Sequence, residues 1–157
     1  MNKTNAMRQL DAAKIKYTPC EYEVDENDLS GTHIADCIGL AYEKVFKTIV
    51  VRSDKSAVFV FCIPCHKEIN LKKAAQVTGS KSVSPVAVKE LLGLTGYIRG
   101  GCSPVGMKKK FPTYFDVSAE NTDELTVSAG VKGIQLLVSR EDIIRFTGAK
   151  IADITSE

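Results

Sequence analysis

The chain has few of the residues and motifs on which most enzymes depend. His33 and His66 are its only histidines, and neither stands in a context typical of a Ser-His-Asp or Cys-His catalytic site. Residues 100–106 are rich in glycine but lack the Gly-Lys-Ser or Gly-Lys-Thr ending of a P-loop, and the carboxylates form no paired motif typical of a glycosidase. A conventional nucleophilic enzyme, a P-loop protein and a glycosidase are therefore disfavoured.

The chain also lacks long apolar runs and a strong charge of either sign. No stretch approaches the roughly 20 apolar residues that span a bilayer, and residues 1–14 have no apolar core typical of a signal peptide. We therefore expect a cytoplasmic protein with no membrane partner. Lys and Arg total 21 against 19 Asp and Glu, so the net charge of +2 is too small to hold a nucleic-acid duplex non-specifically. Any contact with nucleic acid must be local.

The length of 157 residues, with 44% hydrophobic and 25% charged residues, favours one globular domain over residues 1–157. Helical spacing and capping residues predict helices that are capped by Thr4, by Ser30 or Thr32, by Asn70, by Ser84 before Pro85, and by Ser139. Apolar and β-branched runs predict strands at 17–24, 45–51, 57–63, 95–99, 113–117, 124–129 and 133–138, with a possible edge strand at 150–154. This mixture indicates an α+β domain with a curved, largely antiparallel sheet.

Five cysteines, at positions 20, 37, 62, 65 and 102, cannot all pair within the chain, and most have apolar neighbours, which indicates a reducing compartment. Cys62, Cys65 and His66 match the C-x-x-C-H pattern of haem attachment, and they could also belong to a redox pair or a zinc site. No export signal, second C-x-x-C or spaced histidine pair accompanies them. We therefore expect Cys62 to pack inside a strand, with Cys65 and His66 at its end, and we expect no metal or cofactor.

Two further features have a structural and a functional interpretation. Lys47 lies in the apolar strand at 45–51, where it could face solvent or hold an anionic or carbonyl group of a ligand. The glycine-rich loop at 100–106 could be a plain turn or could present backbone N–H groups to an anion or a carbonyl oxygen. The lysines at 108–110 that follow are typical of a solvated face, although they would also suit phosphate contacts. Spacing alone leaves these alternatives open.

Four motifs in order across nearly the whole chain resemble the YbaK/EbsC family, the bacterial Cys-tRNA(Pro) deacylases. They are VFKTIV at 45–50, NLKKAA at 70–75, TGYIRGGCSPVG at 95–106 and VSAGVKG at 127–133. The resemblance implies a mixed, six-stranded, barrel-like sheet surrounded by helices, related to the editing domain of some prolyl-tRNA synthetases. It also implies that the protein hydrolyses, in trans, cysteine wrongly esterified to proline tRNA, and that prolyl-tRNA synthetase is a possible partner.

The resemblance also implies a set of site residues. Lys47 matches the essential lysine of the family, expected to bind the 3′ end of the tRNA and the aminoacyl ester, and Tyr22 matches a pocket tyrosine. Gly100 and Gly101 begin the family's glycine loop, whose backbone would bind the ester and its developing oxyanion, and Ser103 in that loop is expected to contact substrate. Gln135 replaces a small polar or acidic residue of the family, so we assign it to substrate binding rather than to acid–base chemistry.

The family mechanism implies that the thiol of the substrate cysteine attacks its own ester carbonyl and releases a thiolactone. The protein would then supply binding and orientation, and well-oriented intramolecular attack can account for roughly 7–11 kcal/mol of barrier lowering. Three alternatives remain: a related deacylase acting on Ala-tRNA(Pro) or another mischarged tRNA, a non-catalytic tRNA-binding module, and a redox or metal protein centred on Cys62, Cys65 and His66.

Overall fold

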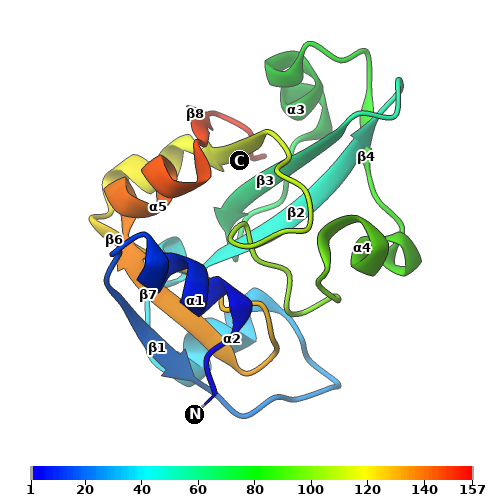
Figure 1. Cartoon of the computed structure of the whole chain (residues 1–157). Coiled ribbons are helices and arrows are strands. Elements are labelled where there is room, and N and C mark those ends of the chain that lie inside the picture. The colour runs from blue at the N-terminus through cyan, green and yellow to red at the C-terminus, as the bar shows by residue number, and fades with distance from the viewer. Residues whose placement is uncertain (1, 157) are drawn as a thin grey trace.

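The computed structural model describes residues 2–156 and shows a mixed α+β fold with eight strands among them (Figure 1). The helices are α1 Asn5–Ala12, α2 Gly31–Ile38, α3 Leu71–Thr78, α4 Val88–Thr95 and α5 Arg140–Thr147, with short 3-10 helices η1 Tyr42–Lys44 and η2 Val117–Asn121. The strands are β1 Tyr17–Glu21, β2 Phe46–Ser53, β3 Val58–Pro64, β4 Val83–Pro85, β5 Thr113–Asp116, β6 Glu124–Ser128, β7 Ile134–Ser139 and β8 Lys150–Ala152.

Four helices begin where the capping residues predict. The side chains of Thr4, Ser30, Asn70 and Ser139 each accept a hydrogen bond from the backbone N–H three residues further on. Such a cap satisfies one of the N–H groups that the first turn of a helix leaves without a partner. Ser30, and not Thr32, is the residue that opens α2, which fixes the start of this helix beside the candidate site described below.

The fourth predicted helix and one predicted strand were placed wrongly. Ser84 and Pro85 lie in β4, where Ser84 is the register partner of Arg52 on β2, and α4 begins only at Val88. An edge strand tolerates Pro85 because the missing N–H leaves no gap in the sheet interior. No strand forms at 95–99, because α4 continues to Thr95 and then ends at Gly96 in the left-handed conformation.

The strands form two sheets rather than one six-stranded sheet. The larger has the order β4-β2-β3-β5-β8 and combines the antiparallel β2–β3 hairpin with parallel β3–β5 and β5–β8 pairs, and the smaller is antiparallel with the order β1-β7-β6. The sheets are linked by one bridge between Val45 and Thr126. The predicted edge strand at the end of the chain is confirmed as β8, whereas no closed barrel is found within residues 2–156, so the barrel remains a prediction.

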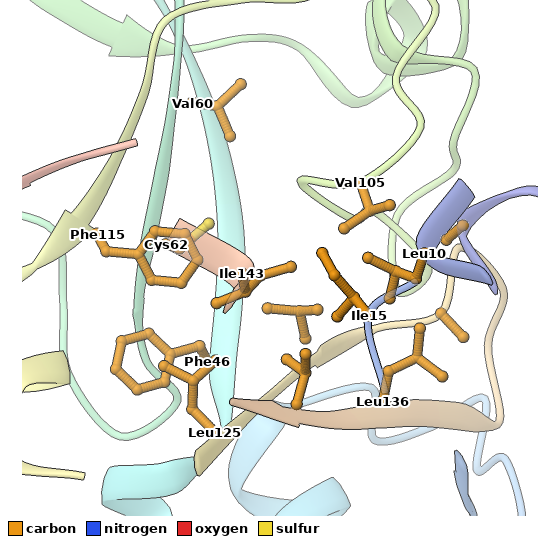
Figure 2. Packing of buried hydrophobic residues seen from close by; sticks show 14 of the residues in the cluster. Leu10, Ile15, Phe46, Val60, Cys62, Val105, Phe115, Leu125, Leu136 and Ile143 are labelled. Carbon is orange, nitrogen blue, oxygen red and sulfur yellow. The ribbon is translucent and has the colours of Figure 1, made fainter. Parts of the chain in front are cut away.

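The main core fills the space between the two sheets and beneath α1 and α5. Figure 2 shows side chains from both sheets in this cluster, among them Phe46 and Phe115 from the larger sheet and Leu125 and Leu136 from the smaller. The rings of Phe46 and Phe115 lie 5.9 Å apart, centre to centre. Because Phe46 is anchored in this cluster, the next residue along β2 projects to the other face of the strand. None of the helices within residues 2–156 is long and apolar enough to cross a membrane.

Candidate active site

A cavity of about 460 Å³ lies where the start of β2 faces the smaller sheet. Its wall is built from the start of β2, the start of α2, the residues that follow β3, the glycine-rich loop, and one residue each from β6 and β7. The hydrogen bond from the Cys65 N–H to the Val45 carbonyl (2.7 Å) and the bridge between Val45 and Thr126 hold these elements together. The cavity is therefore formed by segments far apart in the sequence.

Lys47 lines this cavity and is half-buried. Its place on β2, one residue after the core residue Phe46, directs it away from the main core. Within residues 2–156 its ammonium forms no salt bridge, whereas five other Lys and Arg side chains do. A partly desolvated cation without a counter-ion has a favourable interaction to gain from an anionic or carbonyl ligand.

The start of α2 supplies further donors to the same cavity. Gly31 and Thr32 lie on its wall, and their N–H groups have no intramolecular acceptor among the described residues, because the Ser30 side chain caps the N–H of His33. Free N–H groups at a helix start, together with the helix dipole, favour a negatively charged ligand. Gly31 is required here by packing, since a Cβ at this position would lie 2.5 Å from the Cβ of Cys65.

The glycine-rich loop is fixed by Tyr97. The Tyr97 hydroxyl donates a hydrogen bond to the Val105 carbonyl, and its ring occupies the space that side chains at Gly106 and Gly130 would need. A Cβ at Gly106 would lie 2.8 Å from the Tyr97 oxygen, and one at Gly130 would lie 2.8 Å from its ring. Both glycines also have positive φ values, so a side chain at either position would strain the backbone. The loop is held rigidly beside the cavity.

Of the three loop residues assigned to the site, Gly100 is placed as the motif implies, whereas Gly101 and Ser103 are not. Gly100 lines the cavity with φ +88, and within the described chain its N–H has no acceptor. The Gly101 N–H, by contrast, is used in a turn with the Ile98 carbonyl (3.0 Å), so it is not available to a ligand. Ser103 is fully buried and its hydroxyl accepts a hydrogen bond from the Val105 N–H, away from the cavity wall.

Gln135 lines the cavity, as the resemblance implies, whereas Tyr22 does not. Gln135 is buried on β7 and lines the cavity, and its side-chain oxygen accepts a hydrogen bond from the Thr126 hydroxyl (3.1 Å). Ser128 on β6, the register partner of Gln135, lies on the same wall. Tyr22 does not line the cavity: it lies just after β1, where its N–H donates to the Gly133 carbonyl (2.9 Å). The structure thus brings together Lys47, Gly100 and Gln135.

Two thiols, Cys65 and Cys102, lie on the cavity wall, and both are held in the protonated form. Burial raises the pKa of Cys65 to about 11, against a smaller opposite effect of the Lys47 charge. Burial likewise raises the pKa of Cys102 to about 12. Because the thiolate is the nucleophile, neither side chain is activated for attack near neutral pH. The cavity therefore offers hydrogen-bond donors and a cation to a ligand, and neither of its two thiols is an activated nucleophile.

The C-x-x-C-H residues are divided between two environments, as the strand interpretation predicts. Cys62 lies within β3 with its side chain in the main core (Figure 2), whereas Cys65 and His66 follow the end of the strand and line the cavity. Residues 2–156 contain no group of three or more His, Cys, Asp or Glu side chains placed to hold a metal ion. The metal alternative thus has no assembled ligand set in this part of the chain, and the two cysteines of the redox alternative lie in different surroundings.

Sequence reasoning missed Gly31, Thr32, Cys65, Cys102 and Ser128 as parts of the wall. The capping pattern at Ser30 could have indicated that free N–H groups follow it. No local signal could have shown that Gly31 packs against Cys65, because these residues are separated by more than thirty positions in the chain.

Comparison with known proteins agrees with this architecture. Residues 32–146 match the aminoacyl-tRNA editing domain. The chain is 41% identical over 155 residues to EbsC of Enterococcus faecalis, a candidate deacylase of Cys-tRNA(Pro) and Cys-tRNA(Cys), with 99% of this chain and 94% of EbsC covered. It is also 25% identical to a 119-residue segment of Staphylococcus aureus proline–tRNA ligase, which covers 76% of this chain and 21% of the ligase.

A solved structure has the same fold over the whole length. The crystal structure of a candidate trans-editing enzyme for prolyl-tRNA synthetase superposes with a TM-score of 0.82 at 21% sequence identity and covers all of both chains. The editing-domain match spans well over half of the chain, and the similarity to EbsC extends from end to end. The chain therefore belongs to the aminoacyl-tRNA editing domain family.

Proposed function

We propose that the protein is a trans-acting deacylase that removes cysteine from Cys-tRNA(Pro). Membership of the editing family and the 41% identity to EbsC support hydrolysis of an aminoacyl-tRNA ester as the reaction. The observation that carries the assignment of the site is Lys47, which lines the cavity with N–H groups of Gly31, Thr32 and Gly100 and, like them, has no partner of its own within residues 2–156. A tRNA 3′ end offers the matching groups, namely phosphate oxygens and an ester carbonyl.

The donors divide naturally between binding and catalysis. We assign Lys47 to the 3′ end of the tRNA and the ester region, and the N–H groups of Gly31 and Thr32 to further acceptor atoms of the substrate. The free Gly100 N–H is the backbone donor for the oxyanion that develops on the ester carbonyl, a role that Gly101 cannot share because its N–H is already bonded. Gln135 and Ser128 are neighbouring polar residues of the wall, and we assign the aminoacyl group to this part of the cavity.

The reaction needs no nucleophile from the protein if the substrate thiol attacks. The cysteine sulfur forms a bond to its own carbonyl carbon, the bond from that carbon to the ribose oxygen breaks, and the proton lost by the thiol is balanced by one gained at the ribose oxygen. Water then opens the released thiolactone to free cysteine. The protein's contribution is orientation and stabilisation of the oxyanion. Prolyl-tRNA synthetase remains a proposed partner that could supply tRNA selectivity.

Lys47→Ala should reduce deacylation of Cys-tRNA(Pro) by about 100-fold or more, which is the scale for loss of one preorganised electrostatic contact. The fold should survive, because Lys47 forms no salt bridge in the described chain. Single-turnover deacylation and a thermal unfolding curve measure both properties. Lys44→Ala, which removes an exposed lysine three residues away, is the matched control. A fully active Lys47→Ala variant would remove the central assignment.

Replacing the esterified cysteine by alanine, which has no thiol, should lower the deacylation rate more than replacing the proline tRNA by cysteine tRNA. Cys-tRNA(Pro) should be deacylated rapidly, Ala-tRNA(Pro) should be nearly stable because it lacks a thiol, and Cys-tRNA(Cys) shows how far the tRNA matters. The measurement is the rate of loss of each ester with the isolated protein. Equal rates for the cysteine and alanine esters would reject attack by the substrate thiol and favour an alanine-editing activity, whereas no hydrolysis of any ester would indicate a non-catalytic tRNA-binding module.

The double variant Cys65→Ala/Cys102→Ala should keep deacylation within about threefold of the wild type between pH 7 and 8. The raised pKa values of about 11 and 12 leave both thiols protonated in this range, so neither can serve as the nucleophile. Alanine preserves the Cβ of Cys65 that packs against Gly31. A loss of activity comparable to that of Lys47→Ala, with the fold intact, would indicate a covalent cysteinyl-enzyme route instead.

A further inference from the structure

A second cavity, of about 210 Å³, is lined by the later part of the glycine-rich loop, at Pro104 and Gly106. The loop connects the two directly, since Cys102 lines the first cavity and Pro104 lines the second. Two residues of chain span at most about 7 Å, so Cys102 and Pro104 lie no further apart than this. The remaining walls of the second cavity come from α1, the segment that precedes β5, and the end of α5.

The lining of this second cavity combines aromatic, cationic and amide groups. Phe111 and Phe146 are half-buried, which leaves part of each ring on the cavity side, and Met107 adds apolar surface. Lys109 and Lys110 are exposed at its edge and form no salt bridge within residues 2–156. The Gln9 side chain has no hydrogen-bond partner within the described residues either, so its amide is available to a ligand.

These groups match a nucleotide of a single strand. Successive bases in single-stranded nucleic acid stack on aromatic side chains while cationic side chains contact the phosphates, and an amide can pair with the edge of a base. The volume is smaller than the roughly 300–1,000 Å³ of sites for drug-sized ligands, which suits one base. An acidic peptide would use the lysines but would have no need of two rings and an amide.

We propose that the second cavity binds an unpaired base of the tRNA, about two nucleotides upstream of the terminal adenosine, with Lys109 and Lys110 on the adjacent phosphates. The inference rests on the proposed function, because it takes the aminoacylated adenosine to lie in the first cavity. Cys102 and Pro104, which line the two cavities, lie within about 7 Å of each other along the chain, and this is the scale of two stacked nucleotides at about 3.4 Å each. Lys109 and Lys110 of the lysine run thereby gain a role in binding the substrate.

The test measures equilibrium binding of an uncharged RNA minihelix that ends in single-stranded CCA, so it does not depend on hydrolysis. Lys109→Ala/Lys110→Ala should weaken binding about tenfold at low salt and should lower the slope of log affinity against log salt, because fewer counter-ions are released. Lys55→Ala/Lys81→Ala removes the same charge from exposed positions outside both cavities and is the matched control. Equal affinity of the two double variants would overturn the proposal.

A second comparison tests the base itself. Phe111→Leu/Phe146→Leu keeps apolar bulk against the core but removes the aromatic faces, and Gln9→Ala removes only the amide and leaves the core unchanged. An RNA with an abasic residue at the upstream position should bind the wild type about tenfold more weakly than the intact RNA does. The same change should weaken binding to the leucine variant less than twofold, because that variant has already lost the stacking contact. The assignment would be overturned if the abasic residue weakened binding equally in the wild type and the leucine variant, and if Gln9→Ala bound the intact RNA with wild-type affinity.

The two proposals fail in different ways. If the minihelix binds with the pattern expected here but no aminoacyl ester is hydrolysed, the second cavity stands and the deacylase assignment falls. If cysteine esters are hydrolysed while the lysine, aromatic and amide variants bind the minihelix as the wild type does, the deacylase stands and the second cavity is rejected as a nucleotide site.

Discussion

The junction between the two sheets is the constraint on which the candidate site depends. One bridge, from Val45 to Thr126, links the larger sheet to the smaller, and the carbonyl of the same Val45 accepts a hydrogen bond from the Cys65 N–H. This contact fixes the start of β2, so Phe46 enters the core between the sheets and Lys47 faces the cavity. Half-burial of an ammonium that forms no ion pair within residues 2–156 costs free energy of desolvation, and Lys47 stays there because the core on the other face of β2 determines the position of the strand.

The glycine-rich loop is the second rigid part of the site, and its shape follows from Tyr97. This buried side chain leaves no room for a Cβ at Gly106 or Gly130, and its hydroxyl is bonded to the Val105 carbonyl. The loop therefore contributes to both cavities: Gly100, whose N–H has no acceptor within residues 2–156, lines the first, and Pro104 and Gly106 line the second. Preorganised donors of this kind stabilise a developing charge without a cost of reorganisation at the moment of reaction. The absence of an activated thiol on the wall fits a reaction in which the substrate carries its own nucleophile.

Local patterns predicted much of the fold, because caps, strand runs and stops are short-range signals. Thr4, Ser30, Asn70 and Ser139 cap helices as expected, and Cys62 lies within a core strand. The pattern failed at Ser84, where pairing with β2 overrides a good capping sequence, and at 95–99, where α4 runs on to Gly96. For the site, family resemblance predicted Lys47, Gly100 and Gln135, which all line one cavity, but only the three-dimensional arrangement shows that Gly31 must be glycine because Cys65 packs on it. It also shows that the Gly101 N–H is already bonded and that Tyr22 and Ser103 lie off the wall.

The most direct test of the account is a crystal structure with an analogue of the substrate end in which an amide replaces the cleavable ester, 3′-cysteinylamino-3′-deoxyadenosine. The account predicts that the analogue occupies the cavity at the sheet junction, with its carbonyl oxygen about 2.7–3.2 Å from the Gly100 nitrogen and the Lys47 ammonium in contact with the sugar or carbonyl region. The cysteine side chain should lie toward the wall formed by Ser128 and Gln135. An analogue bound elsewhere, or one bound in this cavity with Lys47 turned away and no donor at its carbonyl, would contradict it.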